Sequence, residues 1–438
     1  MSQAIPRISL TAEEDLLWGL ARSFATAREW PHFTAPTNAE RLDWNKIVAV
    51  AAPNRILPLL NGLLVANGLL SLLPTEAQDA LRDGMTKATE NAARLAGALQ
   101  QYLHLATMRG LETVVMKGIW LSSRVYGDPT LRVGADIDIL VRRSHIQDSL
   151  RILEGMDLGR WWPGLMHDRY YARHHLHQMR CSKDIETWFE VHWTLDHPYT
   201  LLTTDMDALI DRTTPGELLG ESVRDPSLSD LVLSLAVHLV KHAVYLPSVL
   251  NRPDLARIIL ADGMLVYYLD VAEVIKQRGA EMDWPQLLLL ARQWGAGSIL
   301  GCVLRVCHEF LATPVPAEVL AALPIMEPGS LARWAMNRMA DHELSIYLSA
   351  KRSRLWDFLL LTSGTFFLRP IRILDSLPYF FPDRNYLRRR YGSDGTWTRL
   401  RHLVRASQEY ARLGVDTLYY SVERYLHART LPRIEPRQ

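Results

Sequence analysis

The sequence predicts an α+β fold in which a small mixed β-sheet lies between large helical regions. Three observations lead to this prediction. Apolar residues recur every three to four positions from Ala77 to Met108, as on one face of a helix. Short β-branched and alternating runs follow between residues 110 and 200. From Asp230 onward apolar stripes with helical spacing return, and no strand-like run separates them.

The middle of the chain alternates strand and helix signals. Each signal is a short run of apolar or β-branched residues bounded by glycine, proline or polar residues. Ser144 is a suitable N-cap for the second helix, and Ser182-Lys183-Asp184 is typical of a hairpin turn. The predicted order is a strand at Thr113–Met116, a helix at Ile119–Tyr126, a strand at Ala135–Val141, a helix ending near Met156, and strands at His174–Cys181 and Thr187–Leu195.

The last part of the chain is predicted to be helical and locally basic. The clearest helices are expected at Ser229–Tyr245, Leu265–Arg278 and Trp284–Trp294. Residues 351–438 hold 17 Lys and Arg against 8 Asp and Glu. We therefore predict an N-terminal helical region, a mixed core, a helical domain and a basic C-terminal helical region, at residues 1–108, 109–215, 216–350 and 351–438.

The whole-chain composition excludes several classes of protein. The chain has 438 residues, 48% of them hydrophobic, which is ordinary for a globular protein and excludes a disordered one. With 49 basic and 48 acidic residues it is not a general nucleic-acid coat protein, although local nucleic-acid binding stays open. Three cysteines cannot form a disulfide framework, and the N-terminus lacks a signal-peptide pattern, so we expect a cytoplasmic protein. The longest uncharged run, Ile56–Thr75, contains Pro58 and Gly62 and predicts a buried helix rather than a membrane span.

Asp136 and Asp138 are the first candidates for a functional site. They are separated by one residue of a predicted strand, so both side chains lie on the same face. Two carboxylates side by side repel each other and are costly to desolvate unless a cation lies between them. Oxygen ligands on a rigid element suit Mg²⁺, with Mn²⁺ as the alternative. An exposed, charge-protected strand face is the competing interpretation.

Lys117, Gly118 and Arg132 precede Asp136 in the sequence and could contact phosphate. Lys117 and Gly118 follow the first predicted strand and precede a helix. Glycine lets the backbone approach a phosphate closely, and the start of a helix offers N–H donors. Lys117 and Arg132 can supply cations to the same group.

Glu190 is the candidate for a third carboxylate. It lies between Phe189 and Val191 in a predicted strand, where an ionised side chain needs a partner. Asp184 belongs to the predicted turn, and Glu186 is four residues away, about 13 Å along a strand. Glu190 on a neighbouring strand would complete a carboxylate metal site for phosphoryl transfer.

Histidines provide weaker signals. His238 and His242 are four residues apart on a predicted helix, but no glutamate follows the first of them, which favours a packing or capping role. His192 shares a strand face with Glu190 and could orient that carboxylate. His175 and His177 share another strand face and are expected to form hydrogen bonds rather than bind metal.

These motifs, taken in order, resemble the bacterial nucleotidyltransferase-like family of the DNA polymerase β superfold, over residues 110–395. The glycine-serine pair of the wider superfold is replaced here by Lys117-Gly118, so no serine hydroxyl is offered to a triphosphate. The residues that carry the resemblance are Met116-Lys117-Gly118, Tyr126-Gly127-Asp128-Pro129, Arg132, Asp136 to Val141, Glu190-Val191-His192-Trp193, His238 to His242, Leu269-Asp270, Asp283-Trp284, Phe381-Pro382-Asp383 and Tyr386 to Gly392.

The resemblance implies a Mg²⁺-dependent nucleotidyltransferase. Asp136, Asp138 and Glu190 would hold the metal and Glu190 could also take the acceptor's proton, while Lys117, Gly118 and Arg132 would bind the nucleoside triphosphate. The acceptor is not identified: a peptide, a small molecule or a saccharide would each fit. Two alternatives stay open, namely sugar transfer from a nucleotide sugar at the same site, and a regulatory nucleotide-binding module without turnover.

Overall fold

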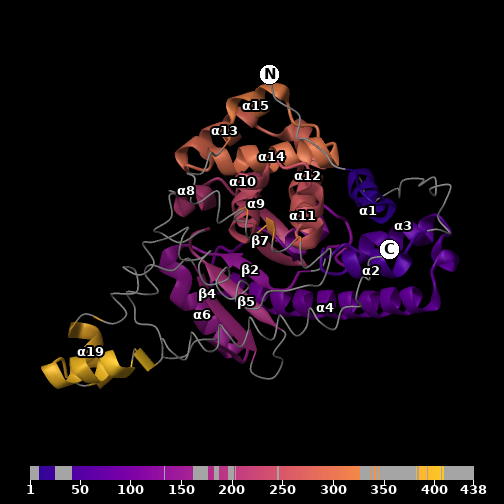
Figure 1. Cartoon of the computed structure of the whole chain (residues 1–438). Coiled ribbons are helices and arrows are strands. Elements are labelled where there is room, and N and C mark those ends of the chain that lie inside the picture. The colour runs from indigo at the N-terminus through magenta and orange to yellow at the C-terminus, as the bar shows by residue number, and fades with distance from the viewer. Residues whose placement is uncertain are drawn as a thin grey trace.

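The computed structural model contains a seven-stranded mixed β-sheet with helices on both sides of it (Figure 1). This architecture confirms the predicted α+β class. The structure describes residues 9–24, 42–132, 134–160, 176–181, 187–195, 204–243, 246–325, 384–391 and 393–405, together with a few single positions.

The sheet contains both parallel and antiparallel pairs, and its strand order is β3-β4-β5-β2-β1-β7-β6. Strand β2 is parallel to β5, and β1 is parallel to β7. The other neighbours are antiparallel, including β4 and β5, which form the predicted hairpin. The bounds are β1 Val114–Val115, β2 Ile137–Leu140, β3 Leu158–Arg160, β4 Leu176–Cys181, β5 Trp188–His192, β6 Thr214–Leu218 and β7 Glu221–Asp225.

The β6–β7 hairpin was not predicted from the sequence. Leu219 and Gly220 form its turn, with φ of 57° and 79°. A two-residue turn with two positive φ angles matches the twist of the strands that it joins. Because β7 pairs with β1, the sheet continues past the predicted core boundary at residue 215 to Asp225. The division of the chain into separate domains otherwise stays a prediction.

The N-terminal helices form one packed group. A capping box at Thr11 and Glu14 begins α1. The uncharged run from Ile56 forms α3, with Pro58 in its first turn, as a buried helix. The bounds are α1 Ala12–Ser23, α2 Trp44–Ala51, α3 Leu57–Ala66, a 3-10 turn at Leu70–Leu72 and α4 Thr75–Met108.

Helices α4 and α6 cover one face of the sheet (Figure 1). Tyr102 of α4 packs against Phe189 of β5, with ring centroids 5.6 Å apart, and its hydroxyl lies 2.7 Å from the hydroxyl of Ser149 of α6. Helix α6 runs from Ile146 to Gly155 and follows a 3-10 turn at Arg143–His145. The prediction that Ser144 caps this helix was wrong, since Ser144 lies inside that turn and no side chain caps the helix.

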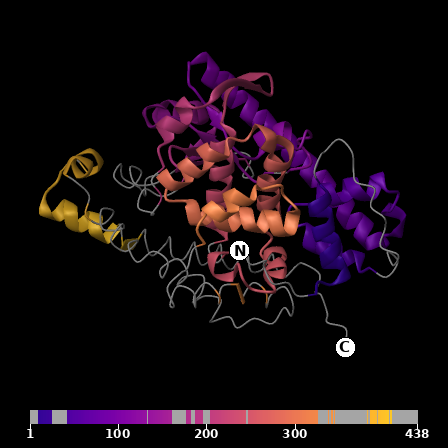
Figure 2. The ribbon, with the colours of Figure 1, turned by 90° about the horizontal axis from the view of Figure 1, so that it is seen from above.

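The second helical region lies on the opposite side of the sheet from α4 in Figure 1, and Figure 2 shows it from above. The side chains of Ser227 and Asp283 cap α9 and α13, as expected for these residue types. The predicted helices are confirmed within a few residues. The bounds are α8 Met206–Asp211, α9 Leu228–His242, α10 Leu246–Val249, α11 Leu255–Ala261, α12 Leu265–Arg278, a 3-10 turn at Gly279–Glu281, α13 Trp284–Gln293, α14 Gly297–Leu311 and α15 Ala317–Ala322. Helix α19, Arg384–Tyr391, lies apart from this region in Figures 1 and 2.

A turn at residues 53–55, between α2 and α3, fastens the N-terminal helices to the second helical region. The buried amide of Asn54 donates to the carbonyl of Leu260, and its oxygen accepts from the backbone N–H of Leu265. A Cβ atom at Gly263 would lie 2.9 Å from the carbonyl oxygen of Pro53, so only glycine permits this close approach.

Two further findings concern the chain as a whole. None of the helices in the described ranges is both long and apolar enough to cross a membrane. The predicted positions His175, Asp184 and Glu186 lie outside the described residues, as does most of the basic C-terminal region.

Candidate active site

Strands β2 and β5 bring two of the predicted carboxylates together. Asp138 is paired with Glu190 in the parallel register of these strands. Phe189 and Val191 are fully buried on the α4 side, so Glu190 and His192, which alternate with them, face the second helical region. The predicted alternation along β5 is therefore confirmed.

His192 joins the two carboxylates. Its Nε2 atom donates to Oδ1 of Asp138 at 2.8 Å and lies 3.4 Å from Oε2 of Glu190. Burial opposes the ionisation of Glu190, but the hydrogen bond and charge of His192 lower the pKa of Glu190 to about 2. Burial also disfavours protonated His192, yet the two carboxylates raise its pKa above the ordinary value. The sequence suggested that His192 orients Glu190. In the structure His192 also contacts Asp138.

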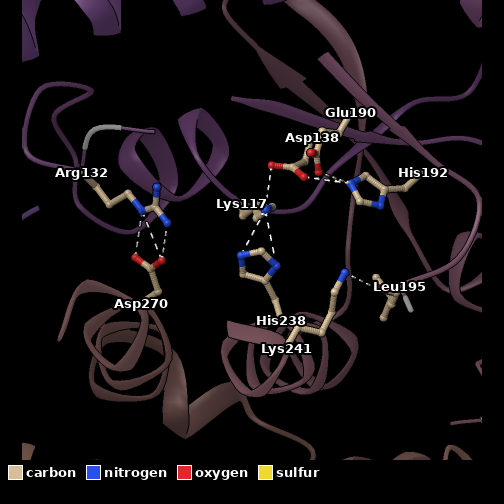
Figure 3. Close-up of polar contacts among 9 residues, drawn as sticks. All are labelled: Lys117, Arg132, Asp138, Glu190, His192, Leu195, His238, Lys241 and Asp270. Atoms are coloured by element: carbon tan, nitrogen blue, oxygen red, sulfur yellow. Dashed lines mark hydrogen bonds and ion pairs between the residues drawn. The ribbon is translucent and has the colours of Figure 1, made fainter. Parts of the chain in front are cut away.

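Lys117 lies on the other side of Asp138 (Figure 3). Its Nζ atom is 3.0 Å from Oδ2 of Asp138 and 3.2 Å from Nε2 of His238 on α9. Burial disfavours the ammonium, but the charges of Asp138, Asp136 and Glu190 outweigh it and raise the pKa of Lys117. Burial and the neighbouring ammonium lower the pKa of His238 well below its ordinary value, so this imidazole is neutral.

Asp136 precedes β2 rather than lying inside it, because the strand begins at Ile137. Burial and the charge of Asp138 raise the pKa of Asp136, while the charge of Lys117 acts in the opposite direction. Gly118 lies next to this segment with a φ of 60° and a ψ of −118°, a conformation that only glycine adopts readily.

The donor set of this cluster fits a divalent cation. Asp138, Glu190 and, once its Nε2 atom has lost its proton, His192 each offer one ligand atom, and these atoms lie within 4.8 Å of one another. The Oδ2 atom of Asp138 is buried and, in the described part of the chain, accepts no hydrogen bond beyond its ion pair with Lys117. Two carboxylates suit Mg²⁺ or Mn²⁺. The grouping differs from the predicted set, because His192 belongs to it and Asp136 does not.

Arg132 is placed differently from the expectation of a phosphate ligand (Figure 3). Its Nε and Nη2 atoms donate to the two carboxylate oxygens of Asp270 on α12, at 3.1 and 2.6 Å. Both side chains are at most 3% exposed, and Tyr126 also donates to Asp270. The pair therefore joins the loop before β2 to the second helical region, and a phosphate contact of Arg132 stays a prediction.

A small cavity of about 40 Å³ lies between the ends of β2 and β5 and helix α9. This volume accommodates a few water molecules. Ser234 lines it with a buried hydroxyl that has no hydrogen-bond partner in the described structure. The remaining lining is mixed, with Met116, Lys117, Asp138, Ile139, Leu140, His192, Leu195, Leu235, His238 and Lys241.

The sequence reasoning missed the part of the site that comes from distant helices. The spacing of His238 and His242 placed both residues on one face of α9, and the sequence predicted that they would pack or cap the helix rather than belong to the site. In the structure their rings contact each other and Tyr267 of α12, at centroid distances of 4.7 to 5.5 Å. No local pattern indicated that His238 would also reach Lys117.

A mixed sheet that carries clustered carboxylates beside a lysine is typical of enzymes that act on phosphate groups. The family model of uncharacterised nucleotidyltransferases matches residues 40–312. The chain belongs to this family and is a nucleotidyltransferase. The match begins just before α2 and so includes α2 to α4, which the sequence resemblance left out, and it ends before the blocks near residue 390. No curated protein and no solved structure matches the chain.

Proposed function

We propose that the protein transfers a nucleotidyl group from a nucleoside triphosphate to an acceptor in a Mg²⁺-dependent reaction. The observation that carries the proposal is the register pair Asp138 and Glu190, with His192 and Lys117 on either side of it. A hydroxyl of a peptide, small molecule or saccharide would serve as acceptor. We also propose that Asp136 joins the ligands of the metal, as the sequence resemblance implies.

The chain's residues have separate tasks in this proposal. An acceptor oxygen attacks the α-phosphorus, the bond to the β-phosphate breaks, pyrophosphate leaves and the acceptor's proton passes to a carboxylate or to water. The carboxylates would hold a divalent cation, which would supply charge stabilisation to the phosphate oxygens. His192 fixes the orientation of Asp138 and Glu190 through its hydrogen bond and ion pair. Lys117, now paired with Asp138, is the cation nearest to that cluster and would contact the triphosphate.

The proposal is tested by binding and by the mass of the product. We expect the parent protein to bind at least one nucleoside triphosphate in calorimetry only when Mg²⁺ is present. The Asp136→Asn variant should lose this binding, whereas its melting temperature without metal stays equal or rises because repulsion with Asp138 is relieved. Asp79→Asn, on the exposed face of α4, is the matched control.

Two outcomes would contradict these expectations. Parent-like nucleotide binding by Asp136→Asn would remove Asp136 from the metal site. A product that gains a sugar mass instead of a nucleotide mass would replace nucleotidyl transfer by glycosyl transfer.

Lys117→Ala should weaken the binding of a triphosphate more than that of the matching nucleoside. A charged hydrogen bond contributes roughly 1.5–3 kcal/mol, so we expect a loss of about tenfold or more in triphosphate affinity. Lys87→Ala, an exposed position of α4, should bind both ligands as the parent does. Equal losses for triphosphate and nucleoside would assign Lys117 a structural role instead.

A further inference from the structure

Arg55 follows Asn54 in the turn that fastens the N-terminal helices to α11 and α12. Its φ is 56°, in the left-handed region that residues other than glycine rarely adopt. The hydrogen bonds of Asn54 with Leu260 and Leu265 hold the turn in place. The surrounding structure thus holds Arg55 in this unfavourable backbone conformation, from which its side chain extends to Tyr267.

The guanidinium of Arg55 lies over the ring of Tyr267, 5.7 Å from its centroid. The ring of Tyr267 is in turn 5.4 Å from that of His238, which contacts Lys117 beside Asp138. A continuous series of contacts therefore connects Arg55 to the carboxylate cluster. In agreement with this position, the charge of Arg55 opposes the rise in the pKa of Asp136 caused by burial and by Asp138.

Within the described residues, the side chain of Arg55 has neither a counter-ion nor a hydrogen-bond acceptor, unlike the other cations near the cluster. Lys117 is paired with Asp138, and Arg132 with Asp270. Lys241 donates to the carbonyl of Leu195. Arg55 is half-buried and forms no ion pair with any residue that the structure describes. A half-buried guanidinium without a carboxylate partner is suited to bind an anionic group of a ligand.

We propose that Arg55 binds the phosphate chain of the nucleoside triphosphate, and that Tyr267 is the positioning residue that holds the guanidinium toward the carboxylate cluster. This inference rests on the proposed function and adds a phosphate ligand from a turn far from the β-sheet in sequence. The family match begins at residue 40, so it includes this turn.

Binding measurements on Arg55 variants of the full chain test the inference. The probes are the four common nucleoside triphosphates, inorganic tripolyphosphate, inorganic phosphate and the matching nucleosides, each with Mg²⁺. Arg55→Ala should weaken the binding of triphosphate and tripolyphosphate about tenfold or more and leave nucleoside binding unchanged. Arg55→Lys should retain part of the affinity. Arg82→Ala, on the exposed face of α4, is the control and should bind all probes as the parent does.

The Arg55→Gly variant separates binding from folding. Glycine adopts the φ of this position without strain, so we expect the same loss of triphosphate binding with a melting temperature that is maintained or raised. A loss of binding together with a large fall in melting temperature for both Arg55→Gly and Arg55→Ala would overturn the inference in favour of a structural role. Tyr267→Leu should lower triphosphate affinity less in the Arg55→Ala background than in the parent protein, because Tyr267 acts through the arginine.

The outcomes distinguish this inference from the proposed function. Parent-like triphosphate binding by Arg55→Ala would overturn the inference alone. If that variant instead lost only the binding of inorganic phosphate, Arg55 would serve an acceptor phosphate, and the assignment to the triphosphate would be wrong. If the parent bound no nucleoside triphosphate, the proposed function would fail, and the inference would fail with it.

Discussion

The Glu190→Gln variant is expected to lose turnover by a factor of about 10³ or more while it keeps most of its nucleotide affinity. Glu190 is paired in register with Asp138 and forms an ion pair with His192, so it contributes a negative charge at the point where a metal is proposed to bind. Glutamine keeps the size of the side chain and removes this charge. In the proposed site, Asp136 and Asp138 would still hold the metal that carries the triphosphate. The measurement is single-turnover product formation combined with nucleotide binding.

A control on the same sheet makes this result specific. Glu217→Gln changes an exposed glutamate of β6 and should leave turnover unchanged. The sequence reasoning also expects Glu186→Gln and Asp184→Asn to remain active. Parent-like turnover of Glu190→Gln, or inactivity of Glu186→Gln by itself, would contradict the assignment of the third carboxylate.

The Asp270→Asn variant should lower the free energy of unfolding by about 3–5 kcal/mol. It leaves the Arg132 guanidinium buried without a counter-charge, and Arg132 is only 4% exposed. Removing one partner of a buried ion pair is much more destabilising than replacing both by apolar residues. We therefore expect the double variant Arg132→Met and Asp270→Leu to recover much of the stability, although the Tyr126 hydroxyl loses its acceptor. Urea unfolding at neutral pH measures each value.

An exposed ion pair serves as the comparison for Asp270. Asp148 contacts Arg151 on α6 with 45% of its side chain exposed, so Asp148→Asn should change stability by only about 0–1 kcal/mol. Equal effects of Asp148→Asn and Asp270→Asn would show that burial does not govern the contribution of the Arg132 pair.

Local patterns were sufficient to predict much of the fold. The apolar spacing of α4 and α12 and the alternation of β5 each depend on neighbouring residues, which the sequence displays directly. The β6–β7 hairpin was missed because Pro215 and Gly216 are poor strand formers. There the pairing of β7 with β1 outweighs local preference.

The candidate site was predictable only where it depends on strand alternation. Asp138 and Glu190 belong to two strands whose patterns were clear, and the structure places them side by side. The partners of Lys117 and Arg132 could not be predicted, because they are His238 and Asp270, 121 and 138 residues further along the chain. Such contacts depend on how whole helices pack, and no residue spacing encodes them.

The hydrogen bonds of the turn at Asn54 can form only late in the synthesis of the chain. Its partners Leu260 and Leu265 lie 206 and 211 residues downstream. At translation rates of about 5–20 residues per second, the amide of Asn54 leaves the ribosome roughly 10–40 s before those partners. The N-terminal helices must spend that interval without their buried attachment. A nascent chain that stops before Leu265 would therefore hold both strands of the carboxylate pair and still lack the surface onto which Arg55 is directed.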